Sequence, residues 1–500
     1  MEEGQVLTRT DAAVVEALAA QNARYAGSRA RSRHLEALAD GAEAVVTGQQ
    51  VGLFLGPLFT TYKAATAVAL ARRLSAQRRR PVVPVFWLQT EDHDLAEIAT
   101  CHVAPARGMS LRLELPADDN RISVAHRVLP EAVDSCLSEM YALLAHLPQA
   151  EGHVNRLRRH YRPGAGWGTA FAGTLAELFA EEGLVLLDPR DPLFAPLSVP
   201  VHRRAIQQAR PIAEALKRHG EELAARGTPP TVHVRDASPL SFFHPDGPER
   251  ARVRLIVSDQ GLAELGRPRV HTEAEILEAL DERPMCFSTS ALLRPILQDT
   301  WLPTTAYVAG PAEAAYFAQL PPLYDAFGMR MPDIVPRVRV RLLEEKTRKA
   351  LTHLRLTAEE ACADEEQVLA RVAALAGDQS TADIVSRRLT AAFGEAMEDV
   401  RPTLRAAGEG IDRAVDKTLA SVKDSISRLA ASYLRAAQLR ERERLDVVRR
   451  LIDWLQPYGQ PQERVYGISY FAAKHGERAF VERVIGAAGD AGDGPVDLEL

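Results

Sequence analysis

One short stretch of the sequence concentrates the side chains that can carry out acid–base chemistry. Residues 91–94 read Glu-Asp-His-Asp, so three carboxylates accompany one imidazole. This combination suits a general base, and its oxygen and nitrogen atoms also bind divalent metal ions. The ordinary alternative is an acidic turn that is simply exposed to solvent. The segment at residues 87–90, which leads into the cluster, argues against a turn that is only solvated. We therefore predict a catalytic role, with metal binding left open, for Glu91, Asp92, His93 and Asp94.

A glycine-rich loop upstream has the features of an anion site. Residues 48–57 read GQQVGLFLGP and lead into an expected helix, where free backbone N–H groups and the helix dipole favour negative charge. The loop matches neither the GxxxxGKS/T nor the GxGxxG pattern, so no nucleotide is identified by motif. Glycines needed only for a tight turn, and a solvated helical lysine, are the alternatives. We predict that substrate or nucleotide is bound by Gly48, Gln49, Gln50, Gly56 and Lys63.

A third set of polar residues lies near residue 300. The segments LRPILQD, from residue 293, and AYVAGPAE, from residue 306, again mark a passage from strand to loop to helix. The guanidinium of Arg294 has the geometry to clamp a carboxylate through two parallel hydrogen bonds. A structural pair between Arg294 and an aspartate, with buried tyrosines, is the alternative. We predict binding roles for Arg294, Gln298, Asp299, Tyr307, Gly310 and Glu313.

All three sets follow stretches with the pattern of β-strands. Residues 44–47 and 82–88 are short, apolar and rich in β-branched side chains, and a helix is expected between them at 58–74. This order predicts an α/β fold with a parallel sheet, whose ligands gather outside the carboxyl ends of the strands. Further strands are expected at 184–187, 232–234, 252–257 and 306–308, and helices near 168–182, 196–226, 272–280 and 312–328. Residues 101–165 and 235–285 interrupt the alternation and are predicted to be insertions in a core that spans 1–337.

The sequence after Pro336 indicates a separate helical region, which we place at 338–457. Glycine and proline become sparse, and apolar residues recur at alternating steps of four and three. This seam has two possible partners, namely the region 338–375 of the same chain or a helix of a second subunit. We predict a homodimer through the 403–456 helix, and expect residues 458–500 to return to the core and end in a loose tail. The seam residues are Val415, Leu419, Val422, Ile426, Leu429, Tyr433 and Ala436, resumed by Leu445, Val448, Ile452 and Leu455.

The composition is typical of a globular protein and argues against nucleic acid and membranes as partners. The chain has 500 residues and a net charge of −6, without the basic excess of most nucleic-acid-binding proteins. Its four cysteines are widely spaced and include no CxxC pair, which predicts neither a disulfide framework nor a zinc ribbon. No apolar run is long enough for a signal peptide or a membrane span. We therefore expect a cytoplasmic protein that binds neither nucleic acid nor membrane.

Four separated motifs carry a resemblance to a known family. TGQQVGLFLGPLFTTYKA, PVFWLQTEDHD, LRPILQDTWLPTTAYVAGPAEAAYFAQL and ERVYGISYFAAKHG resemble, in order, the motifs of the bacillithiol biosynthesis cysteine-adding enzymes. The resemblance extends over nearly the whole chain. It implies a Rossmann-like parallel-sheet core with connecting insertions, and a long α-helical coiled coil used for dimerisation. It also implies that the chain is the ligase of the last step of the pathway, which adds cysteine to the amino group of glucosaminyl-malate.

The implied reaction sets the expected cofactors. Joining a carboxylate to an amine in water is uphill unless the carboxylate is first activated, so ATP is expected, through an acyl-adenylate or an acyl-phosphate. Mg²⁺ is left open, since no motif identifies either cofactor, and the HIGH and KMSKS motifs of the similar class I aminoacyl-tRNA synthetases are absent. In this mechanism the 48–56 loop and Lys63 hold an anionic group, and Arg294 holds a malate or cysteine carboxylate. His93 or a neighbouring carboxylate deprotonates the amine.

Two other classes of function are consistent with the same residues. A metal-dependent hydrolase or deacetylase, acting on an N-acyl sugar, would be centred on residues 91–94 and His102. A non-enzymatic scaffold would depend on the coiled coil. A bound transition metal with ATP-independent hydrolysis would favour the first alternative, and a lack of any small-molecule binding would favour the second.

Overall fold

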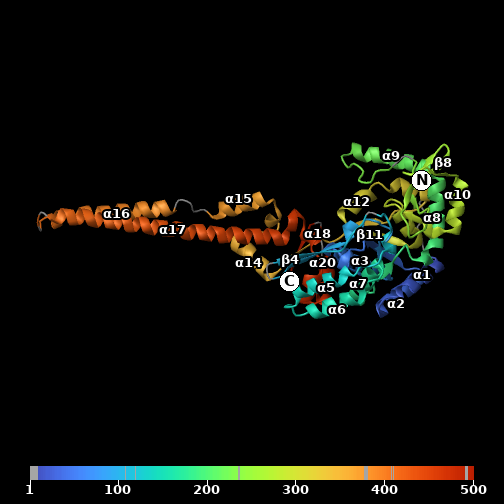
Figure 1. Cartoon of the computed structure of the whole chain (residues 1–500), viewed down its shortest axis with the longest axis horizontal. Coiled ribbons are helices and arrows are strands. Elements are labelled where there is room, and N and C mark those ends of the chain that lie inside the picture. Colours follow the sequence, from blue (N-terminus) through green and yellow to red (C-terminus); the bar gives the residue numbers. More distant parts are fainter. Residues whose placement is uncertain are drawn as a thin grey trace. The chain divides into compact units, whose positions relative to one another are not determined.

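The chain folds into two compact units. The computed structural model describes residues 9–106, 109–118, 120–234, 237–376, 381–406, 408, 410–489, 492 and 494–500. The first unit consists of residues 1–341 and 462–498, and the second of residues 342–461 and 499–500. The chain therefore leaves the first unit near residue 341 and re-enters it at residue 462 (Figure 1).

Within the part of the chain that the structure describes, a parallel sheet of five strands forms the centre of the first unit. Its order is β12-β11-β1-β2-β5, and each neighbouring pair is parallel. The apolar run that forms β2 is buried at every position, as a sheet covered on both faces requires. The parallel α/β sheet predicted from the sequence is thus confirmed. The strands are β1 Glu43–Gln49, β2 Val82–Leu88, β5 Val185–Leu187, β11 Thr304–Ala309 and β12 Asp333–Pro336.

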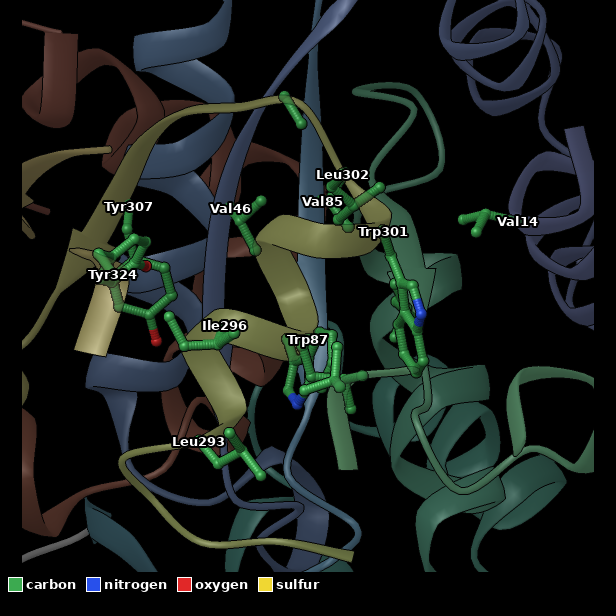
Figure 2. Close-up of a cluster of buried hydrophobic side chains, with 14 of the residues drawn as sticks. Val14, Val46, Val85, Trp87, Leu293, Ile296, Trp301, Leu302, Tyr307 and Tyr324 are labelled. Atoms are coloured by element: carbon green, nitrogen blue, oxygen red, sulfur yellow. The ribbon is translucent and has the colours of Figure 1, made fainter. Parts of the chain in front are cut away.

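Helices pack on both sides of this sheet. On one side, Ile296 and Trp301 of α11 face the strands that carry Val46 and Trp87, and the two indole rings stack with centroids 5.7 Å apart (Figure 2). On the other, α3 covers Val45 and Val308 with its alanine-rich face. The helices around the core are α1 Ala12–Asn22, α2 Arg29–Ala39, α3 Leu58–Arg78, α7 Trp167–Leu178, α8 Ala195–Gln207, α9 Ala209–Ala225, α11 Arg294–Trp301, α12 Pro311–Phe317 and α13 Pro321–Phe327.

Two further substructures occupy the stretches that interrupt the alternation of strands and helices. The first is a hairpin followed by two helices: β3 Thr100–Ala106, β4 Met109–Glu114, α5 Ala132–Leu144 and α6 Ala150–His160. The second is an antiparallel sheet in the order β10-β6-β7-β8-β9, with a small apolar core of its own under α10. Its elements are β6 Ser241–Phe243, β7 Val253–Ser258, β8 Gly261–Glu264, β9 Val270–His271, α10 Glu273–Glu282 and β10 Phe287–Thr289.

Three predicted elements differ from the structure. Residues 232–234 are not a strand, because Val232 and Val234 pack against the core from an irregular segment with no strand beside it. The helix expected at 196–226 is divided into α8 and α9 at Gln208, which leaves the helical region. The helix expected at 312–328 is divided into α12 and α13, because Pro321 and Pro322 lack the N–H groups needed to continue it.

The second unit is helical, and its longest helix packs against the helix before it. Its helices are α14 Glu345–Leu354, α15 Glu365–Ala376, α16 Thr381–Arg405 and α17 Ile411–Leu455. α16 and α17 lie side by side as a hairpin (Figure 1), with ion pairs from Arg401 to Asp416 and from Arg405 to Asp412. The region 338–375 was one of the two partners considered for this seam, and its helices do contact α17. The helix that packs along the seam from Val415 is α16, which the sequence did not indicate.

The C-terminal segment packs against α3 and α6 of the first unit. It contains α18 Gln462–Val465, α19 Ser469–His475, α20 Glu477–Gly489 and β14 Val496–Glu499. Within the tail that was expected to be loose, residues Val496–Glu499 form a strand, in which Val496 N donates to Arg339 O. Glu463 anchors the segment, because its carboxylate accepts two hydrogen bonds from Arg337, at 2.6 and 2.9 Å, and both side chains are buried.

Removing Glu463 is expected to destabilise the first unit strongly. Glu463→Ala would leave the Arg337 guanidinium buried without its anion, which typically costs about 3–5 kcal/mol. Chemical denaturation followed by circular dichroism measures the loss. Glu482→Ala is the matched control, because its i,i+4 pair with Arg478 is exposed and typically contributes about 0–1 kcal/mol. Equal small losses in the two variants would contradict an anchoring role for Glu463.

Candidate active site at the carboxyl edge of the sheet

The segments that carry the predicted site residues meet at one edge of the parallel sheet. β11, β1 and β2 are parallel neighbours, so the loops that follow them emerge together. Gln50 Nε2 donates to Asp92 Oδ2 at 2.7 Å, which joins the loop after β1 to the loop after β2. An ion pair between Lys63 and Glu313 joins α3 to the loop after β11. Tertiary structure thus unites three sets of residues that are far apart in the sequence.

The glycine-rich loop is packed tightly against its neighbours. A Cβ atom at Gly48 would lie 3.0 Å from Trp87 O, and one at Gly52 would lie 2.9 Å from the Cα of Gly56. Gly56 also has a φ of +64°, which glycine adopts readily. The first amide of α3, Leu58 N, donates to Tyr466 O at 2.8 Å. These glycines therefore serve close packing, and the half-buried Gln49 and Gln50 are the part of the loop that a ligand can reach.

Lys63 lies beneath this loop and is only 3% exposed. Its ammonium group donates to Gly48 O at 2.7 Å and to Gln49 Oε1 at 2.8 Å, and it pairs with Glu313. A lysine has three N–H donors, so these partners occupy all of them. Lys63 therefore orients Gln49 and does not offer a free donor to a ligand in this arrangement.

Glu313 is the acceptor at the centre of the neighbouring network. Its carboxylate accepts hydrogen bonds from Tyr307 OH and from Gly310 N, both at 2.8 Å, in addition to the contact with Lys63. Burial acts to raise the pKa of Glu313, but Lys63 and the Gly310 amide more than offset it, so the pKa lies below its usual value. The carboxylate is thus held ionised, and it caps the first turn of α12.

Arg294 is buried within the same network, with 2% exposure. It donates to Gln298 Oε1 at 2.8 Å and to Tyr316 OH at 3.0 Å, and its guanidinium lies 5.0 Å from the centroid of Tyr307. Gln298 in turn donates to Asp299 Oδ1 at 2.8 Å. Arg294 and Asp299 are therefore linked through Gln298 and not by direct contact. The buried guanidinium therefore positions its neighbours. It is not placed to clamp a carboxylate that arrives from solvent.

The four residues of the acidic cluster have different environments. Glu91 is buried and accepts hydrogen bonds from Thr289 N, at 3.0 Å, and from Thr289 Oγ1, so it joins the end of β2 to β10. Asp94 caps α4 (Leu95–Ile98), where it accepts from Glu97 N at 3.2 Å. Burial acts to raise the pKa of Asp92, but hydrogen bonds from His93 and Gln50 hold that pKa well below its usual value. Asp92 is thus an ionised side chain at the solvent boundary.

His93 is the imidazole of this cluster, and about a third of its side chain is exposed. Its Nδ1 atom lies 2.9 Å from an amino group of Arg252 and 3.3 Å from Asp92 Oδ1. Arg252 precedes β7 and also donates to Glu91 O at 3.1 Å. This contact could not be predicted from the sequence, because Arg252 lies 159 residues after His93 and its strand pattern does not specify a partner.

A second pair of functional candidates lies after β5 and was missed. Asp188 accepts a hydrogen bond from Thr90 Oγ1, and burial raises the pKa of Asp188 to about 6. The buried Arg190 donates to Phe287 O at 2.7 Å and to Met285 O at 2.9 Å, which ties this loop to the antiparallel sheet. The rule that places ligands after parallel strands, applied to the strand expected at 184–187, would have identified both residues.

The described residues were also compared with the requirements of other kinds of site. Among them, no three His, Cys, Asp or Glu side chains are arranged to hold a metal ion. No helix among them has the length and apolar character needed to cross a membrane. A cavity of about 580 Å³ is lined by residues of α6, α7, α19 and α20, including His153, Arg156, Glu177 and Glu477, and by none of the predicted site residues.

Comparison with known proteins gives matches over nearly the whole chain. Residues 2–338 match the family model described as "Bacillithiol biosynthesis BshC, N-terminal Rossmann-like domain", and residues 340–487 match "Bacillithiol biosynthesis BshC, C-terminal coiled-coil domain". Both matches agree with the fold class that the sequence predicted. A relative from Salinibacter ruber, named "Putative cysteine ligase BshC", is 33% identical over 91% of this chain and 83% of its own length. Relatives with the same name from Koribacter versatilis and Solibacter usitatus are 35% and 33% identical, over 95% and 93% of this chain and 87% and 85% of theirs.

The buried Asp299 is expected to make stability depend on pH. Burial raises its pKa from 3.8 to about 6, so between these values the folded chain holds a proton that the unfolded chain has released. With respect to this group, stability should therefore be highest below about pH 4, should fall by an amount on the order of 3 kcal/mol as the pH rises from about 4 to 6, and should change little at higher pH. Asp299→Asn should remove this share of the dependence, as measured by denaturation at several pH values. Asp188→Asn is the comparison, and an unchanged slope in the Asp299 variant would refute the assignment.

Proposed function

The chain belongs to the bacillithiol biosynthesis BshC family, and from this we propose that it is a cytoplasmic ligase that joins cysteine to the amino group of glucosaminyl-malate in the last step of that pathway. The names of the relatives support a cysteine ligase. The observation that carries the proposal is the contact between Gln50 and Asp92, which joins two loops at the ligand edge of the sheet. Beside it, His93 is partly exposed.

The proposed reaction needs an activated carboxylate and a neutral amine. ATP, when bound, supplies the adenylyl or phosphoryl group that activates the cysteine carboxylate, and Mg²⁺ would enter with the nucleotide phosphates. The amine nitrogen attacks the activated carbonyl carbon, the phosphate-bearing group leaves with the bonding electrons, and the nitrogen releases one proton. We assign the removal of that proton to His93. Asp92 supports the imidazole but is itself a weak base, because its carboxylate is stabilised in the ionised form.

The remaining candidate residues fall into two groups, those that a ligand can reach and those that are buried. Gln49 and Gln50 are half-buried, and we propose that their amides contact the substrate or the nucleotide. Lys63 and Arg294 were expected to hold anions, but both are buried and hydrogen-bonded to protein groups. We therefore propose positioning roles for them, Lys63 through Gln49 and Arg294 through Tyr316.

Replacing His93 should impair the chemical step and leave the fold intact. Incubation of the chain with cysteine, glucosaminyl-malate and ATP is expected to give the thiol product, detected by mass spectrometry. His93→Asn should lower turnover at saturating substrate by about 100- to 10,000-fold, which is the usual cost of losing a general base. His146→Asn changes an exposed histidine outside the site and serves as the control. Near-normal turnover of the His93 variant would show that the base lies elsewhere, and product formation without ATP would overturn the proposed activation.

We also propose that the chain forms a homodimer through α17. The α16–α17 hairpin leaves several large apolar side chains exposed, and Leu429, at 56% exposure, is the most exposed of them. Exposed apolar side chains on a helical surface are what a helical interface requires. Among the described residues of the hairpin, the others are Ile384, Val385, Leu389 and Val400, all in α16.

A single substitution can test this dimer without disturbing the hairpin. Leu429→Asp is expected to yield monomers in light scattering, because it places a charge in the proposed interface at a side chain that is exposed within one chain. Ser427→Asp, at a neighbouring exposed position, adds the same charge and should leave the dimer intact. A dimer that persists in the Leu429 variant would exclude this interface.

A further inference from the structure

The Nδ1 atom of His93 lies near two groups that require it to be in opposite protonation states. A guanidinium has only donors, so Arg252, at 2.9 Å from Nδ1, requires that this atom accept a hydrogen bond. The ionised Asp92 carboxylate has only acceptors, so Oδ1, at 3.3 Å, requires that the same atom carry a proton. One nitrogen cannot satisfy both groups at once. The shorter distance belongs to Arg252.

The choice between these partners determines what the imidazole can do. When Nδ1 accepts from Arg252, the single proton of neutral His93 lies on Nε2, which can then only donate. A base that acts through Nε2 needs the other tautomer, in which Nδ1 carries the proton and donates it to Asp92. The arrangement in the structure is therefore the tautomer that cannot take a proton at Nε2.

Several contacts hold Arg252 in this position. Its guanidinium donates to Glu91 O at 3.1 Å, lies 3.7 Å from Asp92 Oδ1, and sits 4.2 Å from the centroid of Phe242 in β6. Its side chain is 11% exposed, so it borders solvent beside the substrate edge. The charged groups around His93 are therefore Arg252 from the antiparallel sheet and Asp92 and Glu91 from the loop after β2, with Gln50 bonded to Asp92.

We propose that Arg252 is a positioning residue that keeps His93 in its non-basic tautomer until a substrate carboxylate binds the guanidinium. A carboxylate can accept two parallel hydrogen bonds from arginine, which the ring nitrogen cannot match. Arg252 then releases Nδ1, Nε2 loses its proton to water, and Nδ1 gains one from water and donates it to Asp92. The number of protons on the ring is unchanged, and Nε2 becomes the basic atom. This inference rests on the proposed function, because it gives the carboxylate-bearing substrate the role of switching on the base.

The tautomer can be observed directly, without any turnover. In full-length protein labelled with ¹⁵N-histidine, the ring-nitrogen shifts distinguish a protonated from an unprotonated Nδ1, and His93→Asn identifies the signals of this residue. The unliganded wild type is expected to show the proton on Nε2. Arg252→Met, which removes every side-chain N–H donor at this position, should move it to Nδ1, and malate added to the wild type should do the same.

Two further variants separate positioning from mere packing. Arg254→Met is the matched control, because Arg254 also lies over the Phe242 ring, at 4.9 Å, and its loss should leave the proton on Nε2. Arg252→Lys retains a donor and should keep the wild-type tautomer. In the assay with glucosaminyl-malate, Arg252→Met should raise KM by about 10- to 100-fold, the usual effect of losing a charged hydrogen bond, with a much smaller change in kcat.

Each possible result bears on a different part of the inference. A proton on Nδ1 in the unliganded wild type, or on Nε2 in Arg252→Met, would overturn the control by Arg252. A wild-type tautomer that malate leaves unchanged would overturn the release by a carboxylate. If the tautomer behaves as expected but no thiol product forms from cysteine and ATP, the inference about Arg252 stands and the proposed ligase activity fails.

Discussion

The ion pair of Lys63 and Glu313 is the interaction on which the candidate site depends. The side chain of Lys63 is 3% exposed and that of Glu313 is 17% exposed, so both charges are largely removed from water and are stabilised by one another and by the polar groups around them. Lys63 uses its remaining donors on Gly48 and Gln49, and Glu313 uses its remaining capacity on Tyr307 and the start of α12. Loss of either partner would leave an uncompensated charge inside the protein. The segments after β1 and β11 therefore depend on each other for their positions.

Adjacent residues in the acidic cluster have acquired separate roles through their tertiary partners. Glu91 binds a threonine of the antiparallel sheet, Asp94 caps a short helix, and Asp92 and His93 remain at the solvent boundary. The sequence presents them as equivalent members of one motif. The backbone at the end of β2 turns each side chain toward a different neighbour, so only part of the motif is available for chemistry.

The sequence was sufficient for β1, β2, β5 and β11 of the parallel sheet, because β-branched runs are local signals, but it did not predict β12. The rule for parallel sheets then identified the edge at which ligands are expected. The sequence was not sufficient for side-chain burial. Lys63 and Arg294 read as accessible cations, and their occupied environments depend on partners such as Glu313, 250 positions later in the chain. Arg252 could not be paired with His93 for the same reason. Tertiary packing also determines two other findings. Residues 232–234 lie outside the sheet, and α16 pairs with α17, although the pattern of each segment alone specifies neither.

The order of the strands has a consequence for synthesis of the chain on the ribosome. β1 lies between β2, which follows it closely, and β11, to which Thr47 donates a hydrogen bond at Val308, 261 residues away. The nascent chain therefore presents one edge of β1 unpaired while the insertions and most helices of the first unit are still being made. An unpaired strand edge can recruit other strands, and pairing over so long a separation is slow. Until β11 emerges, that edge of β1 has no partner strand, because α3 covers a face of the sheet and not its edge.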